Sequence, residues 1–181
     1  MGKEQRHLIR RIDSGEWPTL RALRLRSLAE APSAFGQRFE DAAALPDAEW
    51  IQVTRAASEG DQRAWFLAFQ EDAPVGLVQG RRRRPASLLL FSLWVAPEAR
   101  RQAVGIQLID GLEGWALGWH ATETILWVIH GNDAATAFYR SLGFKQLTSG
   151  PDAESGAEHG ATAFRRPIRS GYEVSLRKDS D

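Results

Sequence analysis

The feature that most constrains the fold of this chain is a short apolar run, Ser87 to Val95, with the sequence SLLLFSLWV. The run is too short for most helices, so it predicts a strand. Its continuous apolar character predicts a central strand that is buried on both faces. Pro97 ends this strand, and a helical pattern follows from Val104 to Trp119 with an apolar stripe of Leu108, Leu112, Trp115 and Trp119. The run therefore predicts a sheet that is covered by helices.

Strand-like and helical patterns alternate along the rest of the chain. Further strands are predicted at 7–13, 64–70, 75–80, 124–129, 144–147 and 172–176, and further helices at 17–30, 47–58 and 132–142. This order predicts an α/β (α+β) fold with a mixed sheet and helices on both faces. The length of 181 residues suits a single domain over 1–181. Within it, Thr148 to Ser170 is rich in Gly, Pro and charge and is predicted to be a variable loop.

Composition excludes several classes of function. Lys plus Arg number 23 and Asp plus Glu number 23, so no net charge draws the chain to nucleic acid or to an anionic membrane. The run Arg81–Arg84 has no interleaved aromatic residues and is interpreted as a solvated hairpin tip. The absence of cysteine excludes disulfides, thiolate metal sites and a cysteine nucleophile, and it fits a cytoplasmic location. We expect neither a signal peptide nor a membrane-spanning segment.

A turn rich in hydrogen-bond donors joins the central strand to the helix that follows it. The first N–H groups of a helix are free and carry partial positive charge, so they attract phosphate. Small residues at Ala103 and Gly105 let an anion approach the backbone, and Arg100 and Arg101 add charge that can bind a diphosphate. Taken alone, the same segment also fits a solvated loop with two exposed arginines.

A second junction between a strand and a helix lies at 125–144. Asn132 is typical of the N-cap that precedes a helix. Phe138 and Leu142 are four positions apart and are expected to face the core. Tyr139 is one step round the helix and is expected to face a cleft. The alternatives are a cap without further function for Asn132, and a half-buried aromatic with a satisfied hydroxyl for Tyr139.

Both junctions resemble motifs of one enzyme family. The turn has the pattern Val95-x-Pro97-x-x-Arg100-x-x-Ala103-x-Gly105, which is similar to motif A of the GNAT (GCN5-related) N-acetyltransferases. The second junction is similar to motif B through Leu126, Val128, Asn132, Ala135, Phe138, Tyr139, Gly143 and Phe144. The motifs stand in the family's order, and the resemblance extends from Trp17 onward and is weakest over 148–170. It implies the GNAT acyl-CoA N-acyltransferase fold, with a mostly antiparallel central sheet of about seven strands.

The resemblance implies acetyl-CoA as co-substrate, with no metal, and a role for each matching residue. Backbone amides from Arg101 to Ile106 hold the CoA diphosphate, and backbone groups of Leu93 and Val95 pair with the pantetheine arm. Tyr139 is the general acid that protonates the departing thiolate. The implied CoA-binding residues are Leu93, Trp94, Val95, Arg100, Arg101, Gln102, Ala103, Val104, Gly105, Ile106, Asn132, Ala135, Phe138 and Tyr139. Ala103 departs from the pattern because the family usually has Gly there, which bears on affinity.

The resemblance also implies the reaction, an acetyl transfer from acetyl-CoA to a primary amine of a small molecule by direct attack. The general base stays open because the strand at 88–94 has no carboxylate, so a water chain, His130 or His159 remain candidates. Other functions also stay open: a non-catalytic acyl-CoA-binding module, and a protein N-terminal or lysine acetyltransferase. The sequence leaves the acceptor and a homodimer undecided. Carboxylates that could contact a cationic acceptor, or lie on a solvated face, are Glu40, Asp41 and Glu49.

Overall fold

The computed structural model describes residues 7–168 of the chain. Its strands are β1 (His7–Arg11), β2 (Arg63–Gln70), β3 (Ala73–Arg83), β4 (Ser87–Val95), β5 (Glu123–Ile129), β6 (Lys145–Gln146) and β7 (Ala161–Pro167). Its α-helices are α1 (Trp17–Glu30), α2 (Phe39–Ala43), α3 (Asp47–Ser58), α4 (Val104–Leu117), α5 (Asp133–Ser141) and α6 (Pro151–Glu158), with 3₁₀ turns at Pro32–Ala34 and Pro97–Ala99. Among these residues, no helix combines the length and apolar character required to cross a bilayer.

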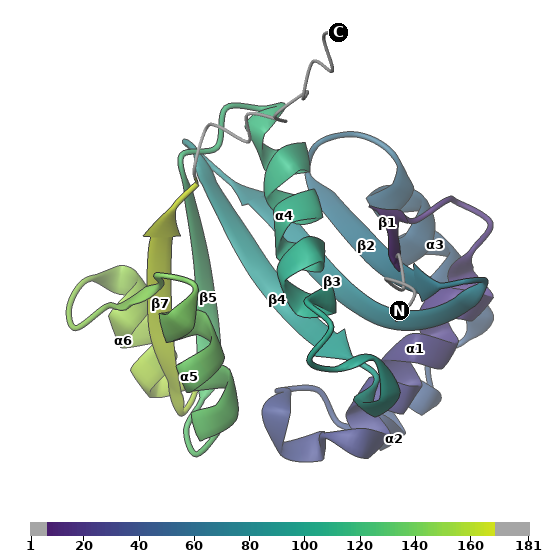
Figure 1. Cartoon of the computed structure of the whole chain (residues 1–181), viewed down its shortest axis with the longest axis horizontal. Coiled ribbons are helices and arrows are strands. Elements are labelled where there is room, and N and C mark those ends of the chain that lie inside the picture. The colour runs from purple at the N-terminus through teal and green to yellow at the C-terminus, as the bar shows by residue number, and fades with distance from the viewer. Residues whose placement is uncertain (1–6, 169–181) are drawn as a thin grey trace, which may run out of the picture.

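The strands form a seven-stranded sheet in the order β1-β2-β3-β4-β5-β7-β6. Within residues 7–168, β4 and β5 are the one parallel pair, and every other neighbouring pair is antiparallel. A parallel pair needs a crossover connection, which α4 supplies. Figure 1 shows α4 crossing one face of the sheet, while α1 and α3 lie behind it on the other face. The predicted mixed, mostly antiparallel sheet with helices on both faces is confirmed.

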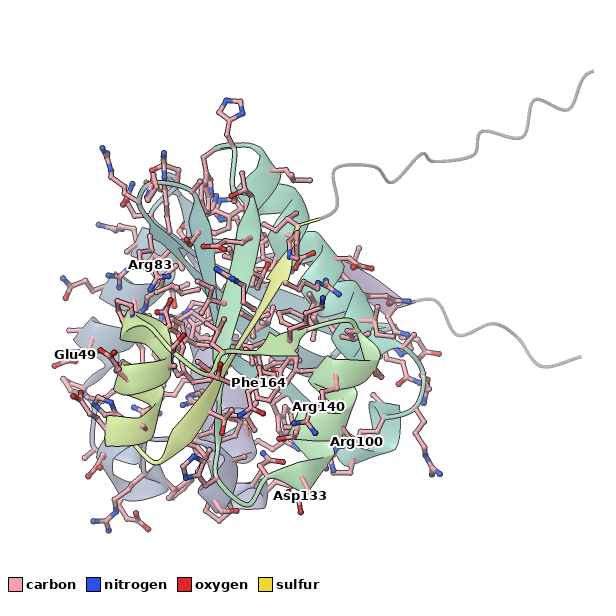
Figure 2. All side chains as sticks on the ribbon, turned by 90° about the vertical axis from the view of Figure 1, so that its left-hand side faces the viewer. Glu49, Arg83, Arg100, Asp133, Arg140 and Phe164 are labelled. Atoms are coloured by element: carbon pink, nitrogen blue, oxygen red, sulfur yellow. The ribbon has the colours of Figure 1, made fainter. Side chains whose placement is uncertain are left out.

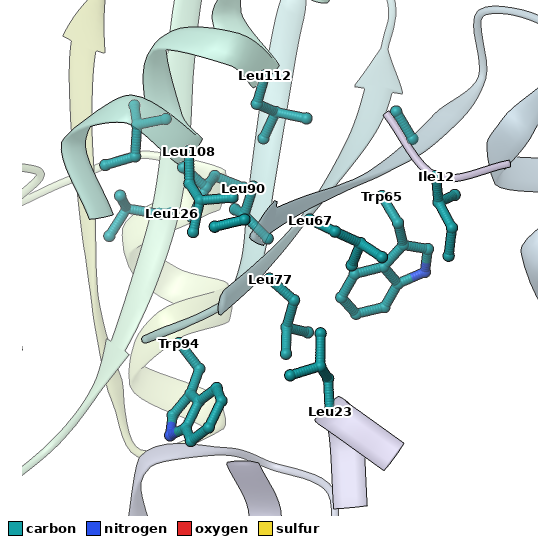
Figure 3. Close-up of a cluster of buried hydrophobic side chains, with 14 of the residues drawn as sticks. Ile12, Leu23, Trp65, Leu67, Leu77, Leu90, Trp94, Leu108, Leu112 and Leu126 are labelled. Atoms are coloured by element: carbon teal, nitrogen blue, oxygen red, sulfur yellow. The ribbon is translucent and has the colours of Figure 1, made fainter. Parts of the chain in front are cut away.

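Alternating side chains of the central strands fill a core on each face of the sheet. On the face of α4, Gly80 of β3 lets Leu112 approach the strand, since a Cβ on Gly80 would lie 2.6 Å from the Leu112 side chain. On the opposite face, Leu23 of α1 lies beside Leu77 of β3, and both are almost fully buried (Figure 3). The sheet is therefore held from both sides, as the apolar run Ser87–Val95 predicts.

The segment predicted as a variable loop, Thr148 to Ser170, contains α6 and β7, so the loop prediction is wrong for most of its length. Apart from Gly156 inside α6, its described Gly and Pro residues lie at the ends of these elements. Gly150, with φ 91°, and Pro151 begin α6, and Gly160, with φ 64°, separates α6 from β7. β7 pairs with β5 along its whole length. The strand predicted at 172–176 lies outside the described residues.

The prediction of a solvated hairpin tip at Arg81–Arg84 is also wrong in part. β3 continues to Arg83, and the turn lies at 84–86. Arg82 forms an ion pair with Asp61, and Arg83 forms one with Asp152 of α6, with hydrogen bonds of 2.5 and 3.0 Å. Acidic partners on neighbouring segments therefore hold these two arginines in the sheet.

Candidate active site

A bulge in β4 separates this strand from β5 halfway along its length. The two strands pair only where Ser87–Leu90 lies beside Glu123–Leu126. Beyond this point, Ser92 and Leu93 of β4 together lie opposite the single residue Val78 of β3. Ser92 also has φ 55°, in the left-handed region. Because such a bulge bends its strand, the second half of β4 diverges from β5 and leaves a gap at the carboxyl ends of the parallel pair.

A cavity of about 490 Å³ lies at this gap, with walls from β2 to β5, α1, α3, α5 and the connection after α1. Figure 2 shows Glu49 of α3 and Arg83 on one side of the sheet, and Arg100 on the other side. Glu49 lines the cavity, which therefore extends along the face that carries α1 and α3. Of the residues predicted to bind CoA, those that line the cavity are Leu93, Asn132, Ala135 and Tyr139.

The turn before α4 has a backbone suited to binding an anion. Arg101 and Ala103 both have φ 61°, in the left-handed region. No described side chain caps the start of α4, so its first N–H groups are free to donate to a ligand. Gly105 lies in the first turn of α4, where a Cβ would be 3.3 Å from Cζ of Phe138. The missing side chain at Gly105 thus permits close packing between α4 and α5.

Two of the predicted CoA-binding side chains instead contact Glu30 at the end of α1. The indole Nε1 of Trp94 donates to the Glu30 carboxylate at 2.9 Å, and the Arg100 guanidinium donates to it at 2.7 Å. The hydrogen bond from Trp94, followed by the one from Arg100, lowers the pKa of Glu30. Arg100 also donates through Nε to the carbonyl of Val95 at 3.0 Å. The prediction that Arg100 is available for a diphosphate is therefore not supported, because its partners are within the protein.

The N-cap predicted at Asn132 is confirmed, since its side-chain oxygen accepts a hydrogen bond from the Ala135 N–H at 3.0 Å. Of the next two aromatic residues, Tyr139 lines the cavity, as predicted, and Phe138 packs against the edge of the core. Phe138 is only half-buried and lies against Gly105. Tyr139 is 7% exposed. Adjacent residues on a helix face different directions, so Phe138 lies against the start of α4 while Tyr139 faces the core and the cavity.

Tyr139 lies at the boundary between the core and the cavity. Its ring packs edge-on against Phe138 and Phe144, at centroid distances of 5.3 and 5.5 Å. It also forms part of the cavity wall. Burial raises the pKa of Tyr139 above its ordinary value, so the hydroxyl stays protonated at neutral pH. Tyr139 is therefore a buried, protonated phenol at the wall of a cavity.

The two histidines predicted as candidates for the general base do not line the cavity. His130 and His159 are exposed, and neither belongs to the cavity lining. Glu40 forms an ion pair with Arg38 at 3.4 Å, on the surface. Glu49 is the acidic side chain of the described residues that lines the cavity. Glu49 was one of the three carboxylates considered for contact with a cationic acceptor, and only the packing of α3 over the sheet distinguishes it from the others.

The sequence analysis missed three arginines in the cavity wall, Arg24 of α1, Arg63 of β2 and Arg81 of β3. One signal for Arg81 was present. Gln79 and Arg81 are two positions apart in a strand, so both side chains point to the same face. No comparable signal places Arg24 near Arg63, because α1 and β2 are brought together only by the fold.

The family model described as "Acetyltransferase (GNAT) family" matches residues 21–144. No curated protein sequence matches the chain. Among solved structures, a GNAT-family acetyltransferase from Streptococcus pneumoniae superposes with a TM-score of 0.71 at 19% identity, covering 91% of this chain and 100% of that one. The PaiA N-acetyltransferase from Thermoplasma acidophilum, in complex with coenzyme A, gives 0.67 at 16% identity, covering 90% and 99%. The ribosomal-protein-S18-alanine N-acetyltransferase from Escherichia coli gives 0.61 at 19% identity, covering 93% and 98%.

The structural likeness shows a shared fold, and the family model accounts for more than half of the chain. Its match includes the bulged strand β4, the uncapped turn before α4 and the helix that carries Tyr139. The chain therefore belongs to the GNAT family of acetyltransferases.

Proposed function

We propose that the protein transfers an acetyl group from acetyl-CoA to the primary amine of a small molecule by direct attack. The observation that carries this proposal is the position of Tyr139, a buried proton donor at the wall of the cavity where β4 leaves β5. A protein that only binds acyl-CoA has no need of a proton donor there. The solved GNAT structures with bound coenzyme A support the choice of co-substrate.

The residues present fit acetyl-CoA. The uncapped N–H groups from Arg101 to Ile106 are suited to the diphosphate, and Gly105 keeps the first turn of α4 compact. Within residues 7–168, β4 has no strand partner on the β5 side beyond Leu90, so the stretch around Leu93 is suited to an extended arm of CoA. The carbonyl of Val95 already accepts a hydrogen bond from Arg100. When bound, acetyl-CoA supplies the thioester that the amine attacks.

The protein's own side chains provide the proton transfers in this proposal. Tyr139 donates its phenolic proton to the sulfur that leaves as a thiolate. Because burial raises the pKa of Tyr139, the hydroxyl enters the reaction protonated, although the same shift makes its proton harder to transfer. The incoming amine must lose a proton, and Glu49 is the described carboxylate that lines the cavity. We therefore place acceptance of that proton at Glu49, directly or through water.

The left-handed backbone of Ala103 gives a prediction for the diphosphate turn. An L-residue at φ 61° is strained by about 1 kcal/mol or more, and glycine is not. Ala103→Gly should therefore raise the free energy of unfolding by up to about 1 kcal/mol, although its more flexible unfolded chain offsets part of the gain. Removing the methyl should also lower the Kd for CoA. Denaturant unfolding and calorimetric titration with CoA measure the two effects.

Ala137→Gly is the matched control for this substitution. Ala137 is an exposed residue inside α5, so glycine should lower the free energy of unfolding there by about 1 kcal/mol. Opposite signs for the two variants are expected. Destabilisation by both, together with weaker CoA binding in Ala103→Gly, would show that the turn is adapted to alanine.

A panel of amines incubated with acetyl-CoA tests the proposed function, with release of free CoA as the readout. At least one small primary amine should accelerate CoA release with saturation kinetics. Acceleration only by peptides or protein N-termini would replace the small acceptor by a protein acceptor. Tight CoA binding with no acceleration by any amine would favour a non-catalytic binding module.

A further inference from the structure

The cavity carries a local excess of positive charge. Of the described residues that line it, Arg24, Arg63 and Arg81 are basic and only Glu49 is acidic. These residues come from four different elements, so the fold assembles the charge from separate segments. The whole chain has a formal net charge of zero. The excess is therefore a property of this cavity and not of the composition.

Among the residues that the structure describes, Arg24 is buried without an acidic partner. It is 6% exposed, and its guanidinium donates to the neutral Oε1 of Gln37 at 3.2 and 3.1 Å and lies 4.7 Å from the Phe35 ring centre. No carboxylate within residues 7–168 forms an ion pair with it. Burial lowers the pKa of Arg24 to about 10. A positive charge that is held away from water costs free energy unless an anion compensates it. A negatively charged ligand in the cavity would therefore stabilise Arg24.

Arg63 and Arg81 add two further positive charges that an anion in the cavity would compensate. They lie directly opposite each other in the pairing of β2 with β3, where like charges repel. Desolvation, and then the charge of Arg63, lowers the pKa of Arg81. In the part of the chain that the structure describes, neither has an ion-pair partner, whereas the neighbouring Arg82 and Arg83 both do. All three arginines that line the cavity thus lack an acidic ion-pair partner within residues 7–168.

We propose that the cavity binds an acceptor amine that also carries an anionic group, a carboxylate or a phosphate, and that Arg24, Arg63 and Arg81 hold that group. The proposal rests on the proposed function, because it names the substrate class of the same site. Guanidinium groups bind both anions through charge-assisted, often bidentate hydrogen bonds. A bound anion compensates the excess charge and fixes the acceptor at one end, while its amine remains free to reach the gap beside β4.

Arg81 offers a cleaner test than Arg24. Arg24 also supports the connection after α1 through Gln37, so its replacement alters packing together with charge. Arg81 is exposed, and its guanidinium donates no hydrogen bond to another described residue. The guanidinium lies over the ring of Phe91, 5.3 Å from the ring centre. Arg84 belongs to the same run, is exposed and does not line the cavity. Arg81→Gln and Arg84→Gln therefore remove the same charge inside and outside the proposed site.

The first experiment compares amines that differ only in the anionic group. β-Alanine is paired with β-alaninamide for the carboxylate, and 2-aminoethyl phosphate is paired with ethanolamine for the phosphate. With acetyl-CoA as donor, kcat/KM for the anionic member of at least one pair should exceed that for the neutral member by about 10- to 100-fold. Arg81→Gln should reduce this preference about tenfold or more, and Arg84→Gln should preserve it. Equal values for both members of both pairs would overturn the proposal.

The second experiment requires no turnover. Inorganic phosphate and succinate are titrated at constant ionic strength into the protein, with and without saturating CoA, and the thermal unfolding midpoint is recorded. At least one anion should stabilise the parent and Arg84→Gln in the presence of CoA, and should stabilise Arg81→Gln much less. Equal stabilisation of Arg81→Gln and the parent contradicts the proposal.

Together, the two experiments distinguish a failure of the proposed function from a failure of the anionic-acceptor proposal. Arg81-dependent binding of an anion without acetylation of any amine contradicts only the proposed function. Acetylation of neutral amines as efficiently as anionic ones contradicts only the anionic acceptor.

Discussion

Replacing Tyr139 with phenylalanine is expected to lower kcat for acetyl transfer by about 10²–10⁴-fold, the usual contribution of a general acid. The substitution removes the hydroxyl and keeps the ring, which packs against Phe138 and Phe144. The free energy of unfolding and the Kd for CoA should therefore change little. Because the lost interaction matters only as the thiolate forms, kcat should fall more than KM for acetyl-CoA rises. Steady-state kinetics with one fixed amine measure both constants.

The pH dependence of kcat checks the same assignment. Tyr139 acts in its protonated form, and burial raises its pKa. Ionisation of this residue should therefore cause no loss of kcat up to about pH 10, where an ordinary tyrosine is already half ionised. Turnover of Tyr139→Phe at the parent rate would show that water or another group protonates the thiolate, and Tyr139 would then be a packed aromatic only.

Replacing Gly105 with valine should raise the Kd for CoA by about 10- to 100-fold, which corresponds to the usual cost of overpacking a tight contact. A Cβ at Gly105 would already lie 3.3 Å from Cζ of Phe138 and 3.8 Å from Cγ2 of Val95. The two methyl groups of valine reach further, so α5 or the start of α4 must move. Either movement displaces the uncapped N–H groups that are proposed to bind the diphosphate.

Gly114→Val is the matched control for Gly105→Val. Gly114 lies in the same helix, and a Cβ there would meet no atom within 4 Å. Both variants introduce the same β-branched residue into α4, so their helix propensities change alike. Only Gly105→Val should weaken CoA binding in the calorimetric titration. Equal affinities in the two variants would place the diphosphate away from this turn.

The sequence predicted the elements that are fixed by local chemistry. Ser87–Val95 is β4 and Asp47–Ser58 is α3, with the boundaries that their apolar patterns and neighbouring prolines indicate. Asn132 caps α5 through a contact three residues away, which is why a local signal located it. The diphosphate turn was found in the same way, because free N–H groups at the start of a helix follow from the position of that start.

The features that were missed depend on contacts between distant segments. Gly150 and Gly160 suggested a loop, yet α6 and β7 form because β7 pairs with β5 and α6 packs over it. Periodicity placed Phe138 and Tyr139 on different faces of the helix, but it did not show that Tyr139 is buried while it lines the cavity. The arginine cluster of the cavity joins Arg24 to residues of β2 and β3, and a sequence pattern contains no information on that distance.

The central claim, direct acetyl transfer from acetyl-CoA to an amine, is tested by following an isotope-labelled acetyl group. The protein is incubated with acetyl-CoA labelled in the acetyl carbons and with the amine that most accelerates CoA release, and both small molecules and protein are analysed by mass spectrometry. Direct attack predicts that the label appears in an amide of the acceptor in amounts equal to the CoA released, with no labelled protein. Label that accumulates on the protein, or CoA release without a labelled amide, would contradict the claim.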